Sequence, residues 1–222
     1  MFKINTKGRI LIILIVFNYS CKSKEDCPNN INLLPMYGDV EKCKSQIESD
    51  KKFVLDSEIK YKTKNKACEF YIAQGWEYFY ANENDLSMKR FNQAWLLDKN
   101  NPEIYWGFGN ILGQKNEYEK SIKYLLKSIK LDSNNAKVYE SISTSYGNIF
   151  NKNKDIKYLN LTIENLEKAA KLDSSNGRIY GQLANSYYYF TQKDSLKKYI
   201  EITDKIDPSF ISPELRARIK KN

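Results

Sequence analysis

The chain reads Ala94-Trp95-Leu96-Leu97-Asp98-Lys99-Asn100-Asn101-Pro102-Glu103-Ile104-Tyr105-Trp106-Gly107-Phe108-Gly109 across the stretch that decides its fold. An apolar phrase ends at Asp98, a polar turn follows, and an aromatic-rich segment begins at Pro102. The closing phrase recurs as Ser128-Ile129-Lys130-Leu131-Asp132, Ala169-Ala170-Lys171-Leu172-Asp173 and Thr203-Asp204-Lys205-Ile206-Asp207. The four endings lie 34, 41 and 34 residues apart, and such a period is typical of repeat proteins.

Residue types also recur at fixed positions inside each repeat. Counted from units that begin near Cys68, Pro102, Ala136 and Gly177, the fourth residue is an aromatic: Tyr71, Tyr105, Tyr139 and Tyr180. A bulky residue and then a small one follow in three units, as Phe108-Gly109, Ile142-Ser143 and Leu183-Ala184. A large residue marks each second helix: Phe91, Leu125, Leu166 and Ile200. This pattern resembles the tetratricopeptide-repeat (TPR) family over about residues 68–210.

The resemblance implies an all-α fold, because each unit is then a helix pair that buries its apolar stripe by stacking on the next unit. We expect a right-handed superhelical stack of about four TPR helix pairs, with units at about 68–101, 102–135, 136–176 and 177–210. The 9 Gly and 5 Pro of the chain favour helices joined by short turns. Seven extra residues of the third unit belong either in the turn at 151–155 or in a longer second helix.

A capping helix is expected in residues 211–222. Ser212-Pro213 reads as a helix N-cap followed by proline at the first helical position. Leu215 and Ile219 would then cover the open end of the stack.

The amino terminus has the plan of an export signal. Lys3, Lys7 and Arg9 precede the apolar run at 10–17, which is too short to span a bilayer as a helix. Ser20-Cys21 at its end resembles the lipobox of bacterial lipoproteins, which predicts a leader at 1–20 and acyl chains such as palmitate on Cys21. The alternative is ordinary cleavage of a secretory signal.

Lipidation would anchor the protein to the outer membrane of a bacterial envelope, on its periplasmic face or at the cell surface. Two or more lipid signals give stable anchoring. Residues 21–32 are expected to form a tether. Within it, Lys24-Glu25-Asp26 resembles a tag for export to the cell surface, and a plain polar spacer is the other interpretation.

Residues 33–67 are expected to form an N-terminal helical extension. Its apolar patch Leu33-Leu34-Pro35-Met36-Tyr37 is expected to dock onto the first repeat. Pro35-Met36-Tyr37-Gly38, Phe91-Asn92-Gln93-Ala94-Trp95-Leu96-Leu97-Asp98 and Tyr105-Trp106-Gly107-Phe108-Gly109 resemble small envelope TPR lipoproteins, a group that implies no activity.

Three cysteines remain once Cys21 is lipidated, and the sequence leaves their pairing open. At most one bridge can form among Cys27, Cys43 and Cys68, and Cys27 to Cys43 is the most local choice. Export makes a disulfide permissible without requiring it.

The resemblance also implies a binding surface on the first helix of each unit, where fixed positions face a concave groove. Asn110 and Asn185 would hold a peptide backbone through paired donors and acceptors, and Lys137 and Arg178 would meet a carboxylate. Trp76, Trp106 and Tyr188 would clamp apolar side chains or stack on sugar rings. Core packing is the other interpretation of these aromatic residues.

Catalysis, metal binding and nucleic-acid binding are not expected. The chain has no histidine, no phosphate-binding glycine loop and no serine-elbow motif, and its cysteines fit no zinc spacing. A pair such as Glu103 and Glu140 could mimic a glycosidase, but acids on helix surfaces are ordinarily solvated. Of the charge of +9, three positives lie in residues 1–9 and the remaining +6 is interleaved with acids, except for a basic cluster at 216–221 that reads as an ordinary polar helix end or as a contact with acidic lipid or polymer. No cofactor is expected.

Three functional hypotheses follow. The first is a non-catalytic adaptor, anchored by lipid to the bacterial envelope, that binds a peptide or an envelope protein in its groove. The second is a surface lipoprotein that captures glycan through the groove aromatics. The third is a structural envelope protein with no groove ligand. The sequence does not identify the partner.

Overall fold

The computed structural model describes residues 27–190 and 192–220, and these residues form helices and no strand. The long helices are α1 (Lys44–Tyr61), α2 (Lys64–Tyr80), α3 (Asn84–Leu97), α4 (Pro102–Gln114), α5 (Tyr118–Leu131), α6 (Ala136–Asn153), α7 (Ile156–Leu172), α8 (Gly177–Tyr189), α9 (Lys193–Ile206) and α10 (Pro213–Lys220). Short 3-10 helices are η1 (Ile31–Leu33), η2 (Pro35–Asp39) and η3 (Pro208–Phe210). The all-α prediction is confirmed.

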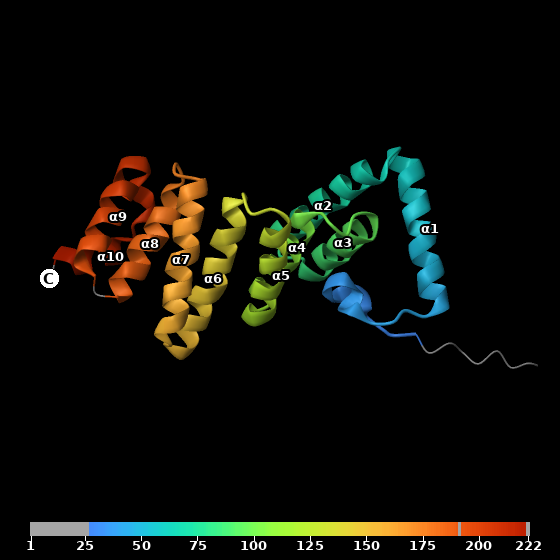
Figure 1. The fold of residues 1–222 in the computed structure, drawn as a ribbon, viewed down its shortest axis with the longest axis horizontal. Coiled ribbons are helices and arrows are strands. Elements are labelled where there is room, and N and C mark those ends of the chain that lie inside the picture. The colour runs from blue at the N-terminus through green and yellow to red at the C-terminus, as the bar shows by residue number, and fades with distance from the viewer. Residues whose placement is uncertain (1–26, 191, 221–222) are drawn as a thin grey trace, which may run out of the picture.

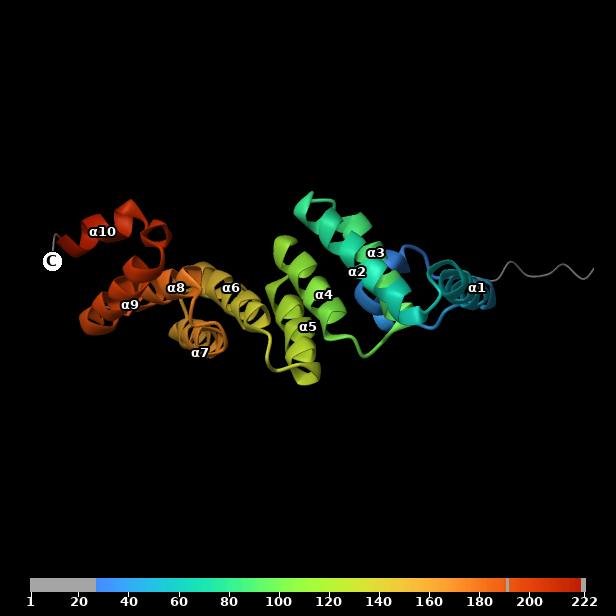
Figure 2. The ribbon, with the colours of Figure 1, turned by 90° about the horizontal axis from the view of Figure 1, so that it is seen from above.

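Four helix pairs follow one another along the long axis of the molecule, with the described ends of the chain at opposite ends (Figure 1). The pairs are α2 with α3, α4 with α5, α6 with α7, and α8 with α9. Figure 2 shows the same succession from above. Each pair also contacts the next, through α3 and α4, α5 and α6, and α7 and α8. The predicted stack of about four pairs is confirmed.

The polar turns between pairs each end in an asparagine that caps the next helix. The side chains of Asn101, Asn135 and Asn176 each accept a hydrogen bond from the backbone N–H two residues further on, at 2.9, 3.1 and 3.2 Å. These bonds satisfy a helix donor that would otherwise have no partner, so the asparagine in each turn starts the next first helix. Within the first two pairs, Asn82 and Asn116 make the tight turn in the left-handed conformation.

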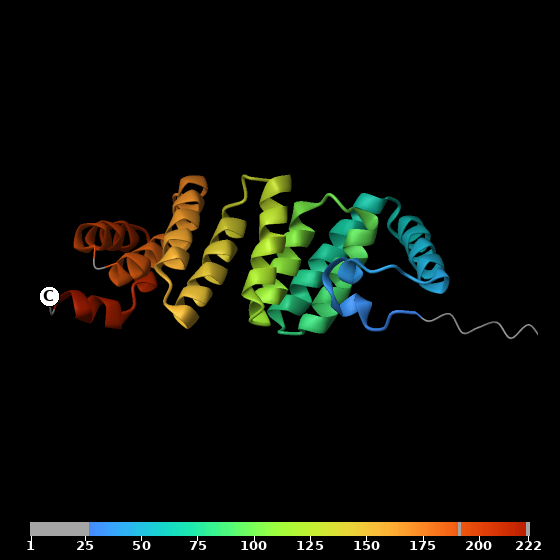
Figure 3. The same cartoon turned by 60° about the horizontal axis from the view of Figure 1, so that its bottom comes forward.

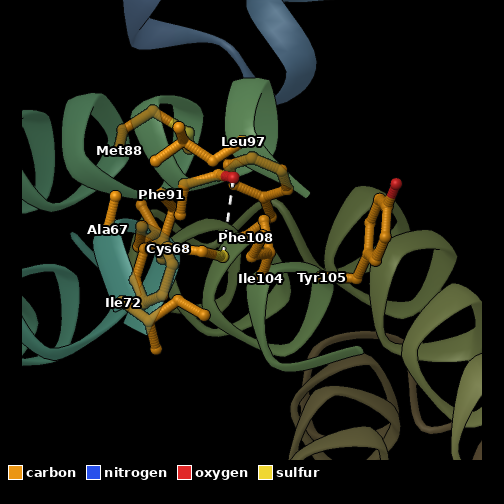
Figure 4. Packing of buried hydrophobic residues seen from close by; sticks show 11 residues of the cluster. Ala67, Cys68, Ile72, Met88, Phe91, Leu97, Ile104, Tyr105 and Phe108 are labelled. Atoms are coloured by element: carbon orange, nitrogen blue, oxygen red, sulfur yellow. Dashed lines mark hydrogen bonds between the residues drawn. The ribbon is translucent and has the colours of Figure 1, made fainter. Parts of the chain in front are cut away.

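Large residues of the second helices fill the space left by small residues of the first helices. Phe91 is fully buried between Gly75 and Gly107, where an added Cβ would come within 2.8 and 2.4 Å of its ring. Leu125 lies in the same way against Gly109. Figure 4 shows Phe91 at the centre of the first core cluster, where the Cys68 thiol donates to the Ala94 carbonyl oxygen at 3.7 Å.

The third pair accommodates its seven extra residues in helices. Compared with α4 and α5, α6 is five residues longer, α7 is three longer, and the turn between them is one residue shorter. The expected longer second helix is present, whereas a longer turn at 151–155 is not, because residues 151–153 continue α6. The first helix therefore takes most of the insertion.

The N-terminal segment η1–η2 docks onto α3 (Figure 3). Asn92 is fully buried and its amide donates to the carbonyl oxygens of Asn32 and Leu34, both at 2.9 Å, while it accepts from the Tyr37 N–H at 3.3 Å. A disulfide joins Cys27 to Cys43, and Cys68 is a buried thiol. Residues 27–32, which the sequence analysis placed in the tether, are thus fixed to the fold by covalent and hydrogen bonds.

The C-terminal end is covered by η3 and α10. Ser212 caps α10 by accepting from the Leu215 N–H at 3.1 Å, as the sequence predicts. Leu215 is buried with Ala184, Leu196 and Ile211. The side chain of Ile219, the second expected covering residue, lies outside the described residues, and so do the leader and Cys21.

Across the described ranges, no helix is both long and apolar enough to cross a membrane.

Candidate functional site: a groove between the first helices

A cavity of about 500 Å³ lies between the first helices of the four pairs and the start of α5. Its lining includes five of the seven residues predicted to contact a partner: Trp76, Trp106, Asn110, Lys137 and Arg178. These residues come from α2, α4, α6 and α8, so the stacking of the pairs is what brings them together.

One wall of this cavity is aromatic. The rings of Trp76 and Trp106 lie 4.4 Å apart between centroids at an interplanar angle of 54°, and Tyr80 stacks on Trp76 at 6.0 Å. Both tryptophans are partly exposed, and the Trp76 indole N–H donates to Glu103 Oε1 at 2.8 Å. The wall therefore combines contact with the core and a surface open to the cavity.

Asn110 takes part in a hydrogen-bond network within the cavity wall. Its Nδ2 donates to the Trp106 carbonyl oxygen at 2.8 Å, and its Oδ1 lies 3.2 Å from the Ser141 hydroxyl, whose one hydrogen is shared with the Lys137 carbonyl oxygen at 2.9 Å. Ser141 Oγ in turn accepts from the Trp106 indole N–H at 3.0 Å. One Asn110 N–H and one lone pair stay uncommitted by these bonds, so the amide can still pair with a peptide group.

Arg178 is held by a carboxylate of its own chain. Glu140 is buried, and Arg178 approaches it with Nε to Oε1 and Nη2 to Oε2, both at 2.8 Å. Gln182 Nε2 adds a bond to Oε1 at 3.2 Å. Burial raises the pKa of Glu140, and the charge and hydrogen bonds of Arg178 oppose that shift. Glu140 thus already occupies part of the Arg178 guanidinium, which was predicted to meet a partner's carboxylate.

Lys137 is the other cation of the cavity, and it is exposed. No ion pair joins it to an acidic side chain within residues 27–190 and 192–220. Because Glu140 and Arg178 neutralise each other, the unbalanced charge among the residues that line the cavity is the positive charge of Lys137.

A second cavity of about 220 Å³ continues from the first and is lined by α6, α7 and α8. Thr144, Asn148 and Gln182 line both cavities, and Asn185 lines the second. The two together are called the groove below. Residue Asn151, in the added final turn of α6, also lines the second cavity, so the insertion lengthens the groove.

Tyr188 is not among the residues that line either cavity. It packs against the C-terminal cluster of Ala184, Leu196, Ile211 and Leu215. Tyr189 lines the second cavity in its place.

Several polar residues of the groove were not predicted from the sequence, among them Asn148, Ser141 and Gln182. Ser141 and Gln182 both stand sixth in their units. Their shared position is a signal in the sequence, but the second unit has Gly107 there, which conceals the pattern.

Among the described residues, no three His, Cys, Asp or Glu side chains are grouped to hold a metal ion. The free thiol of Cys68 is buried in the first core cluster, and burial raises its pKa to about 12, which keeps it protonated and unreactive at neutral pH.

No protein-family model and no curated protein matches the chain. Among solved structures, the crystal structure of MamA matches with a TM-score of 0.54 and 18% identity, over 70% of this chain and 81% of MamA. TTC0263, a thermophilic TPR protein from Thermus thermophilus, matches with a TM-score of 0.57 and 13% identity, over 69% of this chain and 80% of its own.

YrrB, a TPR protein with an unusual peptide-binding site, matches with a TM-score of 0.52 and 15% identity, over 76% of this chain and 86% of its own. At these identities the likeness concerns the fold. The chain is therefore an all-α solenoid with the TPR fold. The resemblance to TPR proteins that the repeats predict is thereby confirmed for the fold.

Proposed function

We propose that the protein is a non-catalytic adaptor, anchored by lipid to a bacterial envelope, that binds a peptide segment of a partner protein in the groove. The observation that carries the proposal is the 500 Å³ cavity in which Trp76, Trp106, Asn110 and Lys137 meet from three repeats. Concave sites with an apolar wall and a few polar groups are the usual form of ligand sites.

An extended peptide fits the arrangement of these groups. Trp76 and Trp106 offer aromatic surface to an apolar side chain, and the amides of Asn110, Asn148 and Asn185 run on along the groove for a peptide backbone. Lys137 favours an acidic residue in the same peptide. YrrB, which has the same fold, supports the proposal because its site binds a peptide.

Two features support the proposed envelope location. The sequence places a cysteine directly after the apolar run of a leader, and the fold pairs Cys27 with Cys43. Disulfides form and persist in oxidising compartments outside the cytosol. Replacement of Cys21 by serine should move the protein from the membrane to the soluble fraction, and unchanged fractionation would refute lipid anchoring at that residue.

A charge reversal in the groove tests peptide capture. Lys137→Glu places a negative charge opposite the acidic residue that the proposal expects in the partner. Lys130→Glu, at an exposed position of α5, is the matched control. In a cross-linking pull-down from intact envelopes, Lys137→Glu should lose a protein that native and Lys130→Glu chains both retain. Identical captures from all three chains would refute the adaptor.

Trp106→Ala with Asn110→Ala is the more severe change. Both residues bond to Ser141 across two repeats, so this variant also loses stability. Its capture should be measured only where circular dichroism shows the native helical signal, and loss of capture there supports the groove as the site.

Glycan capture is the second candidate, and the paired tryptophans favour it. Exposed aromatic rings beside polar groups can stack on sugar rings. The candidate predicts that oligosaccharides change the fluorescence of Trp76 and Trp106 while acidic peptides do not. The opposite result supports the adaptor.

A further inference from the structure

Helix α1 has a packed face and an opposite exposed face that bears apolar residues. Phe53, Val54 and Tyr61 turn toward the first core cluster. Leu55 is 60% exposed and Ile59 is 80% exposed, and their spacing of four places them on one face of the helix. Figure 1 shows α1 at the end of the solenoid, running across its long axis.

Lysines flank this apolar pair. Lys51 and Lys52 are exposed one turn before Leu55, and Lys62 is exposed directly after the helix. Glu48 and the exposed Asp56 are the acids of the helix at matching spacing. Asp50 pairs with Lys42, and Glu58 lies 4.0 Å from Lys64. The exposed face of α1 is therefore apolar at its centre, and Lys51, Lys52 and Lys62 outnumber the two acids at its edges.

The chain enters the fold beside this helix. Cys43 is the N-cap residue of α1, and its disulfide holds Cys27 at a Cα–Cα distance of 5.2 Å. Gln46, in the first turn, donates to the Pro28 carbonyl oxygen at 2.8 Å. Cys27 lies six positions after Cys21, a span of at most about 20 Å when fully extended. An acylated Cys21 would thus keep α1 close to the bilayer.

We propose that the exposed face of α1 is a membrane-surface contact that lies on a bilayer rich in anionic lipid. Leu55 and Ile59 enter the boundary between headgroups and acyl chains, and Lys51, Lys52 and Lys62 meet the anionic headgroups. The inference rests on the envelope location of the proposed function, but the contact itself requires neither the acyl chains nor the groove.

The contact gives the solenoid an orientation. Because α1 runs across the end of the long axis, a bilayer against its exposed face leaves the helix pairs projecting away from the membrane (Figure 1). The groove on α2, α4, α6 and α8 then stays open to a partner. Acyl chains on Cys21 alone would leave that orientation undefined.

Vesicle sedimentation of the chain from residue 21 onward, with Cys21→Ser, tests the contact without acyl chains. The probes are phosphatidylglycerol-rich vesicles and pure phosphatidylcholine vesicles at low salt. Leu55→Ser with Ile59→Ser removes the apolar pair, and Leu126→Ser with Leu172→Ser is the matched control, because those leucines are 45% and 43% exposed on α5 and α7. Analytical ultracentrifugation of the same chains measures self-association.

We expect binding to phosphatidylglycerol-rich vesicles that weakens with salt, and a loss of about tenfold in partitioning for the α1 variant but not for the control. No sedimentation of the native chain, or equal loss in both variants, would overturn the proposal. Self-association that the α1 variant abolishes, without vesicle binding, would also overturn it and would assign the face to a second copy. None of these outcomes bears on peptide capture, which the pull-down tests separately.

Discussion

Glu140 and Arg178 form an unequal pair between the third and fourth repeats. The Glu140 side chain is 7% exposed, whereas the Arg178 side chain is 56% exposed. Removal of either charge therefore has different consequences. An unpaired guanidinium here is hydrated by solvent, but an unpaired carboxylate stays buried, and the cost of leaving a buried charge without a partner is the larger one.

Arg178→Leu should accordingly lower the free energy of unfolding by about 2–3 kcal/mol, and Glu140→Gln by about 1 kcal/mol. Gln182 can still bond to the amide oxygen in the second variant, which is why the loss is smaller. Denaturant titration of both variants at neutral pH measures the difference. An equal or reversed order would contradict the burial assigned to Glu140.

The pH dependence of the Arg178→Leu variant follows from the pKa of Glu140. Burial raises that pKa in the folded state, so the folded protein binds more protons than the unfolded one between the two pKa values, and stability falls as pH rises through this window. Without Arg178, the two effects that oppose the shift are lost and the pKa rises further. The loss of unfolding free energy of Arg178→Leu relative to the native protein should therefore shrink as pH falls toward 4.5, the ordinary pKa of a glutamate. Denaturant titration of both proteins across this pH range measures that loss.

Gly107 and Gly113 give a matched test of packing within one helix. A Cβ at Gly107 would lie 2.4 Å from the Phe91 ring, whereas at Gly113 the nearest atom is Ser121 Oγ at 3.5 Å. Gly107→Ala should cost about 2 kcal/mol or more, as overpacking does, and Gly113→Ala should be neutral or stabilising through its helix propensity. Thermal melts of the two variants measure the difference in stability. An unchanged melting temperature for Gly107→Ala would contradict the close contact between Gly107 and the Phe91 ring.

Single positions of the groove were predictable to different degrees. The resemblance to TPR repeats predicts Trp76, Trp106 and Lys137 in one groove, because they stand ninth, fifth and second in their units and these positions face the groove in that family. It does not predict that Arg178 is bound by Glu140, since that pairing depends on the offset between two repeats. Tyr188 was expected in the groove, but the end of the stack turns it onto the C-terminal cluster.

The N-terminal segment is a short element whose backbone is strained. Met36, Tyr37 and Asp39 have φ values of 54°, 59° and 55°, the left-handed region that costs about 1–2 kcal/mol for a non-glycine residue. The bonds to Asn92 and the Cys27–Cys43 disulfide hold it in place. The docking of the apolar patch on the first repeat was predictable from its composition. The left-handed turn was not, because only Gly38 marks it in the sequence.

Asn92→Ala should release this segment. Its amide makes three bonds to the segment, so we expect a loss of about 2–3 kcal/mol and faster hydrogen exchange in residues 31–39. Asn165→Ala is the control, because Asn165 is also buried but its one side-chain bond reaches the Leu161 carbonyl oxygen in its own helix. Faster exchange in both variants, or in neither, would show that Asn92 does not anchor the segment.

The third repeat shows how an element responds to an insertion. Polar Asn and Lys residues at 151–154 read as a turn, yet the helix continues to Asn153 and ends with Lys154 in the left-handed conformation. The preceding residues Ile149 and Phe150 are buried, and this apolar anchor extends α6. Packing thus outweighs the weak turn preference of the asparagines.

The groove exists only because the helix pairs stack on one another. The first cavity is lined from four first helices, so no repeat contains it alone. In a solenoid each repeat is stabilised mainly by its neighbours, and loss of one interface separates the two halves of the site. In the proposed arrangement, membrane binding by α1 and partner binding by the groove use different surfaces.

The central claim is that a partner lies in the groove, and photo-cross-linking tests it most directly. A photoreactive amino acid that replaces Thr144 lies where the two cavities meet. The same amino acid in place of Lys130 lies at an exposed position of α5 outside both cavities. Irradiation of intact envelopes should give a discrete adduct from position 144 and none from position 130. No adduct at 144, or the same adducts at both positions, would contradict the account.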